Sequence, residues 1–253
     1  MFDLAILGGP TELHWRGQRV RLRPMEGVLL LALVCSKGHL LPIAKLARRL
    51  YPDNGHEAAT RTTASHASHV RKAMRAAGVD DDALVSERVR GGIAYRLDIP
   101  AESIDAYRFE RQVAAGCGEF QQGLHGDAAA TLEAALSLWR GAPLSDAADW
   151  PFASVEIARL ENLHRAATIT LMEARIAVGR HWQVIGELAG MAAARPDDGK
   201  VLYLLITSLY LSERDAEAGA ACQDGIRAFR ERGLDTSRLE TLQRHVLTGS
   251  LPR

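Results

Sequence analysis

The chain has few of the residues that mark secreted, disulfide-linked or membrane-spanning proteins. It contains only three cysteines among 253 residues, Cys35, Cys117 and Cys222, at wide spacings. An odd number of separated cysteines fits reduced cytosolic thiols better than a disulfide framework. The longest apolar run, Val28–Cys35, is much shorter than the roughly 18 residues of a membrane span. No charged segment typical of a signal peptide precedes this run, so we expect no export, no membrane association and a cytoplasmic location.

The sequence also lacks the short motifs of common enzyme sites. It has no Gly-x4-Gly-Lys-Ser/Thr phosphate-binding loop, which argues against an ATPase module. The glycines of Gly116–Gly123 follow no predicted strand, as a dinucleotide site would require. Acidic pairs such as Asp197 and Asp198 fall in turns, and no Ser/His/Asp or Cys/His set has a supporting motif. We therefore expect neither an enzyme nor a bound cofactor.

The formal net charge is zero, but the charges are unevenly distributed. Residues 1–100 contain 15 Lys/Arg against 10 Asp/Glu, whereas residues 101–253 contain 16 against 21. A basic half joined to an acidic half is typical of a polyanion-binding module coupled to a second module. Chance variation would also produce a difference of this size, so the charges alone leave both interpretations open.

The first hundred residues predict a small mixed domain, consisting of an antiparallel meander, three helices and a β-hairpin. The strands of the meander are predicted over Phe2–Gly8, Thr11–Trp15 and Arg19–Arg23. The helices are predicted over Met25–Ser36, from the residue after Leu41 with Pro42 in the first turn, and over about Glu57–Ala77. The hairpin is predicted around Arg90-Gly91-Gly92.

From Ile104 onward the pattern is helical almost to the end. Three segments resemble one another, each beginning after a turn: Gly126–Trp139, Arg180–Pro196 and Arg214–Phe229. Aligning His181 with Asp215 gives a period of 34 residues, the length of a tetratricopeptide helical hairpin. The first two segments are separated by extra residues that include the aperiodic Trp139–Pro151. We expect its tryptophans, Trp139 and Trp150, to belong to the core rather than to a ligand groove, because aromatic side chains dominate burial.

The third predicted helix of the first domain has an unusual polar face. No carboxylate occurs between Ala58 and Val79. At about 100° per residue, a stripe of Thr63, Ala67, Val70 and Met74 points one way and predicts the buried side. The opposite side carries only hydroxyls, cations and an imidazole: Arg61, Ser65, Ser68 and Lys72, flanked by His69 and Arg75.

Short polar side chains with interspersed cations are suited to a helix in a DNA major groove. Cations neutralise phosphates, and hydroxyl and imidazole groups offer hydrogen bonds to base edges. A solvated face is the alternative, but such faces usually mix glutamate with lysine. The preceding helix and turn complete a helix-turn-helix. The hairpin tip adds Arg88 and Arg90, which suit an adjacent minor groove, although an ordinary edge ribbon would look the same.

His66 and His69 have the i, i+3 spacing that metal ligands on a helix can have. No cysteine or further histidine follows at zinc-site spacing. From the sequence we therefore favour a structural or DNA-facing role for both histidines over a metal site.

These motifs together resemble a known family. Arg61–Met74 resembles the recognition helix of response-regulator-type winged helices, and Val89–Leu97 resembles their wing. The second half resembles the bacterial transcriptional activation domain, most specifically in the Leu-Trp-Arg-Gly-x-Pro-Leu string at Leu138–Leu144. The combination is identified as the short two-domain form of the Streptomyces antibiotic regulatory protein family. The resemblance implies a winged helix-turn-helix at residues 1–100 and an all-α, tetratricopeptide-like domain at residues 101–253, so a mainly α fold.

The resemblance also implies a function. Members of this family activate secondary-metabolite gene clusters, bind direct repeats of double-stranded DNA near the promoter, and contact RNA polymerase and its sigma factor. From this we expect self-association on DNA and association with the nucleoid. The positions that match the recognition helix are Arg61, Thr62, Ser65, Ser68, His69, Arg71 and Lys72, and Arg90 matches the wing arginine. Ala94 stands where glycine is common, the wing is one residue longer, and His69 stands where arginine is frequent; these departures bear on wing geometry and base preference.

A second class of function stays open on the sequence. Stacked helical hairpins form concave surfaces that bind proteins, so the chain would also suit a protein–protein adaptor whose basic helix is merely solvated. The two hypotheses differ in one observable, because the adaptor would show no salt-dependent binding to duplex DNA.

Overall fold

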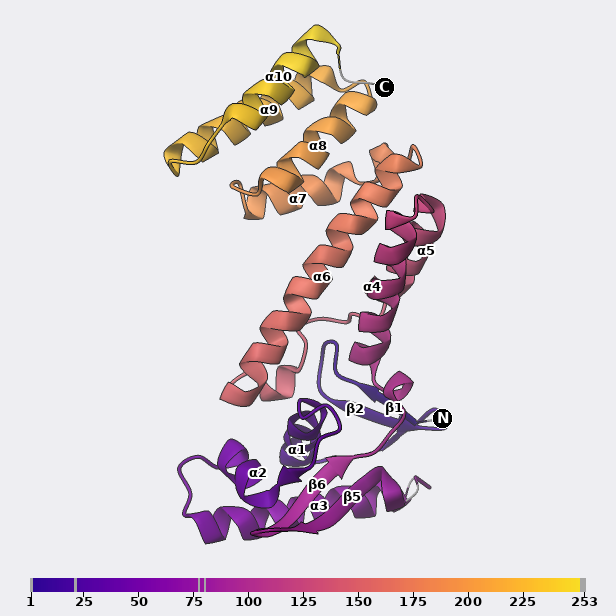
Figure 1. Cartoon of the computed structure of the whole chain (residues 1–253), viewed down its shortest axis with the longest axis vertical. Helices are drawn as coiled ribbons and strands as arrows, with labels where there is room; N and C mark the ends of the chain where they lie inside the picture. Colours follow the sequence, from indigo (N-terminus) through magenta and orange to yellow (C-terminus); the bar gives the residue numbers. More distant parts are fainter. Residues whose placement is uncertain (1, 21, 77, 80, 251–253) are drawn as a thin grey trace. The chain divides into compact units, whose positions relative to one another are not determined.

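The computed structural model describes residues 2–20, 22–76, 78–79 and 81–250 (Figure 1). The chain forms two compact units. The first comprises Met1–Val113 and Ala134–Arg165, and the second comprises Ala114–Glu133 and Ala166–Arg253. Helices dominate, with two small sheets in the described residues, which confirms the predicted fold class. The functional division at about residue 100 stays a prediction.

The first unit begins with the predicted meander. Its strands are β1 (Phe2–Ala5), β2 (Glu12–Trp15) and β3 (Gln18–Val20). They form an antiparallel sheet in the order β1-β2-β3, in which Leu4 lies opposite Leu13 and Leu13 lies opposite Val20. All three of these apolar residues are buried, so the alternation in the sequence sets the register. The third strand is shorter than predicted, and Arg21 lies outside the described residues.

Three helices and a hairpin follow in the predicted order. The helices are α1 (Pro24–Val34), α2 (Ile43–Leu50) and α3 (His56–Ala76). The hairpin consists of β5 (Leu84–Val89) and β6 (Gly92–Leu97). A two-residue strand, β4 (Leu41–Pro42), pairs with β6, so the second sheet has the order β4-β6-β5. Pro42 is therefore the last residue of this strand and stands immediately before α2, so the prediction that it lies in the first turn of the helix is wrong.

Helix α1 is buried on nearly all sides. Every residue from Glu26 to Val34 is buried, since the helix contacts α2, α3, β6 and the short 3-10 helix η3 (Ser145–Ala147). An apolar run without a polar face is what such a central position requires. Helix α3 instead buries the one stripe that its periodicity predicts, Thr63, Ala67, Val70 and Met74, together with Ala59.

A buried carboxylate joins the start of the chain to the helix that follows the hairpin. Asp105 begins α4 (Asp105–Gln121) and is only 3% exposed. Its oxygens accept the backbone N–H groups of Ile6, Leu7 and Ala106 at 2.8–3.0 Å. Burial raises the pKa of Asp105, while these three N–H groups and the guanidinium of Arg140 oppose that shift. One side chain thus satisfies three backbone donors that have no strand partner.

The same two N-terminal residues also bind the aperiodic segment between the helical repeats. The carbonyls of Ile6 and Leu7 accept the N–H groups of Leu144 and Arg140 at 2.8 and 2.7 Å. Next to them Gly8 has φ +107°, and a Cβ there would lie 2.1 Å from the backbone nitrogen of Gly141. Only glycine permits this approach. The Leu-Trp-Arg-Gly string therefore packs within the first unit.

Trp139, in the same segment, packs on aromatic neighbours of the first unit. Its ring meets Phe109 edge-on, with centroids 5.4 Å apart, and lies 4.3 Å from the ring of His164. Phe109 is fully buried, which agrees with a core position for this cluster. Trp150 is half-buried.

The other helices follow the predicted repeat pattern. They are α5 (His125–Leu136), α6 (Pro151–Ala177), α7 (Ile185–Ala194), α8 (Gly199–Leu211), α9 (Asp215–Glu231) and α10 (Ser237–Thr248). In the second unit α7 packs on α8, α8 on α9 and α9 on α10, which is the hairpin stacking expected of tetratricopeptide-like repeats. No helix of the described residues is both long and apolar enough for a membrane span.

We expect Asp105→Ala to lower the free energy of unfolding by about 3 kcal/mol or more, because three buried N–H groups lose a charged acceptor at once. Urea unfolding followed by circular dichroism measures this change. Asp149→Ala removes an exposed aspartate of the same unit and serves as the control. An equal effect of the two substitutions would contradict the structural role of Asp105.

Candidate nucleic-acid interface

The candidate interface is built on α2, the turn after it, and α3. Helix α2 ends at Leu50, and Tyr51–Gly55 forms the turn, in which the N–H of Asn54 bonds to the carbonyl of Tyr51. Proline, aspartate, asparagine and glycine in this turn are residues that stop one helix and permit a sharp change of direction. Helix α3 then starts at His56, and α2 packs along it, which confirms the predicted helix-turn-helix.

One side of α3 is exposed along its whole length, and we call it the polar face. Its members are Arg61, Thr62, Ser65, Ser68, His69, Lys72 and Arg75, all exposed. The side chain of Arg61 is 76% exposed, and its ion pair with Glu57 at 3.7 Å joins two solvated groups, so it holds the guanidinium only weakly. The structure therefore places seven of the predicted site residues together on one surface.

Arg71 differs from the other predicted residues of this helix. It is half-buried, and its guanidinium donates a 2.9 Å hydrogen bond to the carbonyl of Leu84 at the start of β5. This bond fastens the hairpin to α3. The resemblance assigned Arg71 to the recognition helix, and the structure adds a second, structural task for the same side chain.

The predicted wing is the hairpin β5–β6. Arg88 lies opposite Ile93, and Val89 lies opposite Gly92, which leaves Arg90 and Gly91 as the turn. Gly91 has φ +98°, a conformation that favours glycine. Arg88 and Arg90 are both exposed at this end of the hairpin.

The wing's third arginine has a structural role. Arg96 forms ion pairs with Asp98 at 3.2 Å and Glu87 at 3.9 Å, so its charge is compensated within the fold. It is accordingly not a candidate for phosphate contact.

Helix α2 contributes cations that the sequence analysis did not select. Residues 43–76 contain seven Lys/Arg and two Asp/Glu. Two of these cations, Lys45 and Arg48, are exposed on α2. In a helix-turn-helix the first helix crosses the DNA backbone, which is where such side chains act. The sequence already indicated a basic helix here, because Ile43–Leu50 contains three Lys/Arg residues and no carboxylate.

Two histidines of α3 are tied to neighbouring elements. The Nε2 atom of His66 lies 2.7 Å from the Tyr51 hydroxyl, and the two rings are stacked. Burial lowers the pKa of His66, which favours the neutral imidazole, and the charge of Glu26 opposes this shift. The Nδ1 atom of His69 lies 3.5 Å from the buried carboxylate of Glu26 in α1. His69 is thus both an exposed member of the polar face and a neighbour of α1.

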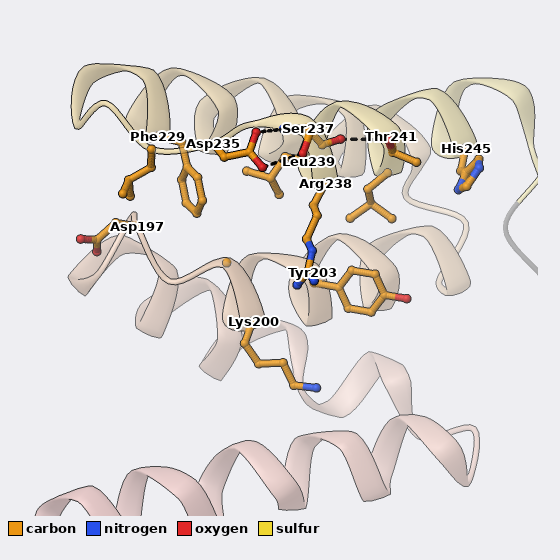
Figure 2. A pocket seen from close by; sticks show the side chains of 13 residues that line it. Asp197, Lys200, Tyr203, Phe229, Asp235, Ser237, Arg238, Leu239, Thr241 and His245 are labelled. Carbon is orange, nitrogen blue, oxygen red and sulfur yellow. Dashed lines mark hydrogen bonds between the residues drawn. The ribbon is translucent and has the colours of Figure 1, made fainter.

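The second unit contains a different concave feature, a groove of about 980 Å³ bounded by α8, α10 and the end of α9 (Figure 2). Its walls carry apolar rings, Phe229 and Tyr203, beside charges of both signs, such as Asp197 and Arg238. Asp235 at its edge accepts the N–H and the hydroxyl of Ser237 and thereby caps α10. None of the predicted DNA-binding residues lines this groove, and its mixed lining selects no single class of ligand.

The geometry defines a class of protein: a winged helix-turn-helix followed in the same chain by tetratricopeptide-like helical hairpins. The model of the "Bacterial transcriptional activator domain" matches residues 104–247, more than half of the chain. With the preceding winged helix, the chain belongs to the Streptomyces antibiotic regulatory protein family and is a transcriptional regulator.

Regulatory proteins with similar sequences support this assignment. The chain is 30% identical to the transcriptional regulatory protein EmbR of Mycobacterium tuberculosis. This similarity covers 85% of the chain and 55% of EmbR. It is 29% identical to the regulatory protein AfsR of Streptomyces griseus over 94% of the chain and 24% of AfsR. With the regulatory protein DnrI of Streptomyces peucetius it shares 28% identity over 83% of the chain and 78% of DnrI.

A solved structure agrees with the fold. The structure of Mycobacterium tuberculosis EmbR in complex with a low-affinity phosphopeptide matches all of this chain and 66% of that one, with a TM-score of 0.87 and 28% identity. The chain spans about half the length of EmbR itself, 55%. The phosphopeptide in that structure is a ligand of EmbR.

We expect Arg61→Glu and Lys72→Glu to weaken binding to every duplex, because each replaces a phosphate attraction by a repulsion. The slope of log affinity against log salt should flatten by about one unit per lost phosphate contact. Fluorescence anisotropy at several salt concentrations measures both effects. The control, Arg244→Glu, makes the same charge change at an exposed position of α10 and should leave the affinity unchanged. If all three variants bind like the parent chain, Arg61 and Lys72 are not in the interface.

Proposed function

We propose that this regulator is a sequence-specific DNA-binding activator that inserts α3 into the major groove of operator DNA. One observation carries the proposal: the polar face of α3 combines exposed cations with short hydroxyl side chains and has no carboxylate after its first turn. A solvated helix gains nothing from excluding carboxylates over that length, whereas a helix placed against phosphates does.

The polar face offers two kinds of contact. Arg61, Lys72 and Arg75 carry the charge that neutralises phosphates, which fixes the position of the helix but reads no sequence. Ser65, Ser68 and His69 are shorter and lie between them, at spacings of three and four residues, on one side of the helix. Hydroxyl and imidazole groups there meet base edges in the major groove, where the donor and acceptor pattern distinguishes all four base pairs.

The hairpin supplies a second contact. Arg88 and Arg90 lie at its exposed end, and the Arg71 bond to Leu84 keeps the hairpin in a fixed position relative to α3. An arginine inserted in a minor groove gains from its concentrated negative potential. Thr62 and Arg71 complete the proposed set, with Arg71 acting mainly through the hairpin.

The proposal extends to partners and to the regulated genes. The similarity of residues 104–247 to a transcriptional activator domain supports contact with RNA polymerase and its sigma factor. The similarity to Streptomyces regulators AfsR and DnrI supports a role in a secondary-metabolite gene cluster, with binding to direct repeats near the promoter. The proposal includes self-association of two copies bound to adjacent repeats.

Footprinting on the promoters next to its own gene tests the proposal directly. The expected result is protection of two or more repeats in the same orientation, with activation of the neighbouring promoter in a reconstituted transcription assay. The adaptor alternative predicts no protection and no salt-dependent duplex binding. That outcome would leave the polar face of α3 as an ordinary solvated surface.

We expect alanine at Ser65, Ser68 or His69 to reduce discrimination between operator and random duplex by about 1–3 kcal/mol per lost base contact. The ratio of the two affinities at one salt concentration measures it. Ser137→Ala, at an exposed serine outside α3, is the matched control. Should both affinities fall while their ratio holds, these side chains position the helix and do not read the bases.

A further inference from the structure

Three side chains with metal-binding chemistry converge where α1 meets α3. Glu26 comes from α1, and His66 and His69 come from α3. One ligand atom from each lies within 4.8 Å of the other two. The carboxylate is buried, His66 is half-buried and His69 is exposed, so the cluster opens from the core toward the surface of α3.

The carboxylate of Glu26 is poorly compensated for its depth. Its side chain is only 5% exposed. Oε2 accepts the backbone N–H of Arg23 at 2.8 Å, which forms part of the cap of α1. Oε1 lies 3.5 Å from His69 Nδ1 and 4.0 Å from Nε of Arg23, whose side chain is 75% exposed. A buried carboxylate is costly without a close cation, and neither neighbour is at hydrogen-bond distance from Oε1.

His66 has one nitrogen to spare. Its Nε2 bonds to the Tyr51 hydroxyl at 2.7 Å, while its Nδ1 is shielded from solvent and has no hydrogen-bond partner in the described residues. When Nε2–H donates to Tyr51, the lone pair lies on Nδ1. Metal-bound histidines show this arrangement, in which the outer nitrogen donates to an acceptor that fixes the ring.

We propose that Glu26, His66 and His69 bind one divalent transition-metal ion of the zinc class, which bridges α1 and α3. Two imidazole nitrogens with one carboxylate suit zinc and its neighbours better than calcium or magnesium, which prefer oxygen ligands. Bonds of about 2.0–2.1 Å in a tetrahedral site separate the ligand atoms by about 3.4 Å, close to the 3.5 Å between Glu26 Oε1 and His69 Nδ1. The fourth position is left to water.

No further cysteine or histidine lies at zinc-site spacing from His66 and His69 along the chain, so the sequence favoured other roles for them. The proposed third ligand is a glutamate 40 residues before His66, on a different helix. Such an ion also fixes the imidazole of His69 beside α1. The effect on base recognition rests on the proposed function, whereas the site itself does not and is tested without DNA.

The test uses the full-length, untagged chain, stripped with chelator and titrated with Zn²⁺ by calorimetry and with Co²⁺ by absorption spectroscopy. We expect one tight equivalent and a visible Co²⁺ band of tetrahedral intensity. Glu26→Gln keeps an oxygen for the Arg23 N–H and should weaken binding at least about tenfold, as should His66→Ala and His69→Ala. His69 is exposed, so its variant folds even if the others do not.

His56→Ala is the matched control, since it removes an exposed histidine from the first turn of the same helix. It should bind Zn²⁺ like the parent chain. The proposal is overturned if the parent binds no equivalent, or if His69→Ala and Glu26→Gln keep the parent's affinity and Co²⁺ band. The second result would show that the ion binds to other histidines and is an adventitious ion only.

Discussion

The first unit depends on the hydrogen bonds that the carboxylate of Asp105 accepts. It holds the N–H groups of Ile6 and Leu7 and caps its own helix through Ala106. The carbonyls of the same two residues bind the segment around Leu144. A chain cut at residue 100 would therefore keep the helix-turn-helix and the wing but lose both sets of partners for Ile6 and Leu7. The winged helix is not structurally independent of the residues that follow it.

This arrangement gives the Leu-Trp-Arg-Gly string a physical meaning. The backbone nitrogen of Gly141 lies so close to Gly8 that a Cβ on residue 8 would overlap it, so the glycine that this contact requires is Gly8. Trp139 packs on Phe109, and Arg140 lies 3.8 Å from the carboxylate of Asp105. The Leu-Trp-Arg-Gly string lies in the helical half of the sequence, but it packs against the N-terminal half. Its backbone contacts there cannot be recognised from the sequence.

Helix α3 buries one side in the core and exposes a polar face on the other. Its buried stripe is small, with Ala59, Thr63 and Ala67 in three successive turns, which lets α1 and α2 approach closely. His69 belongs to the polar face and also lies 3.5 Å from Glu26 of α1, so it connects α1 to the surface that we propose to meet DNA.

The sequence by itself determined what depends on local periodicity. The meander, the helix-turn-helix, the hairpin with its Gly91 turn and the division of α3 into two faces follow from spacings of two and of 3.6 residues, and the structure confirms them. The two-residue strand β4 was missed because alternation over two residues carries no signal. The polar face of α3 could be predicted as a set, since its members share one side of a helix, whereas Arg71 lies outside that face.

Only the tertiary structure decided which distant groups meet. Asp105 and Ile6 are 99 residues apart, and Glu26 reaches His66 and His69 from another helix. The bond from Arg71 to Leu84 likewise depends on how the hairpin packs on α3. The partner of each of these groups is set by the path of the folded backbone, which no local pattern of residues encodes.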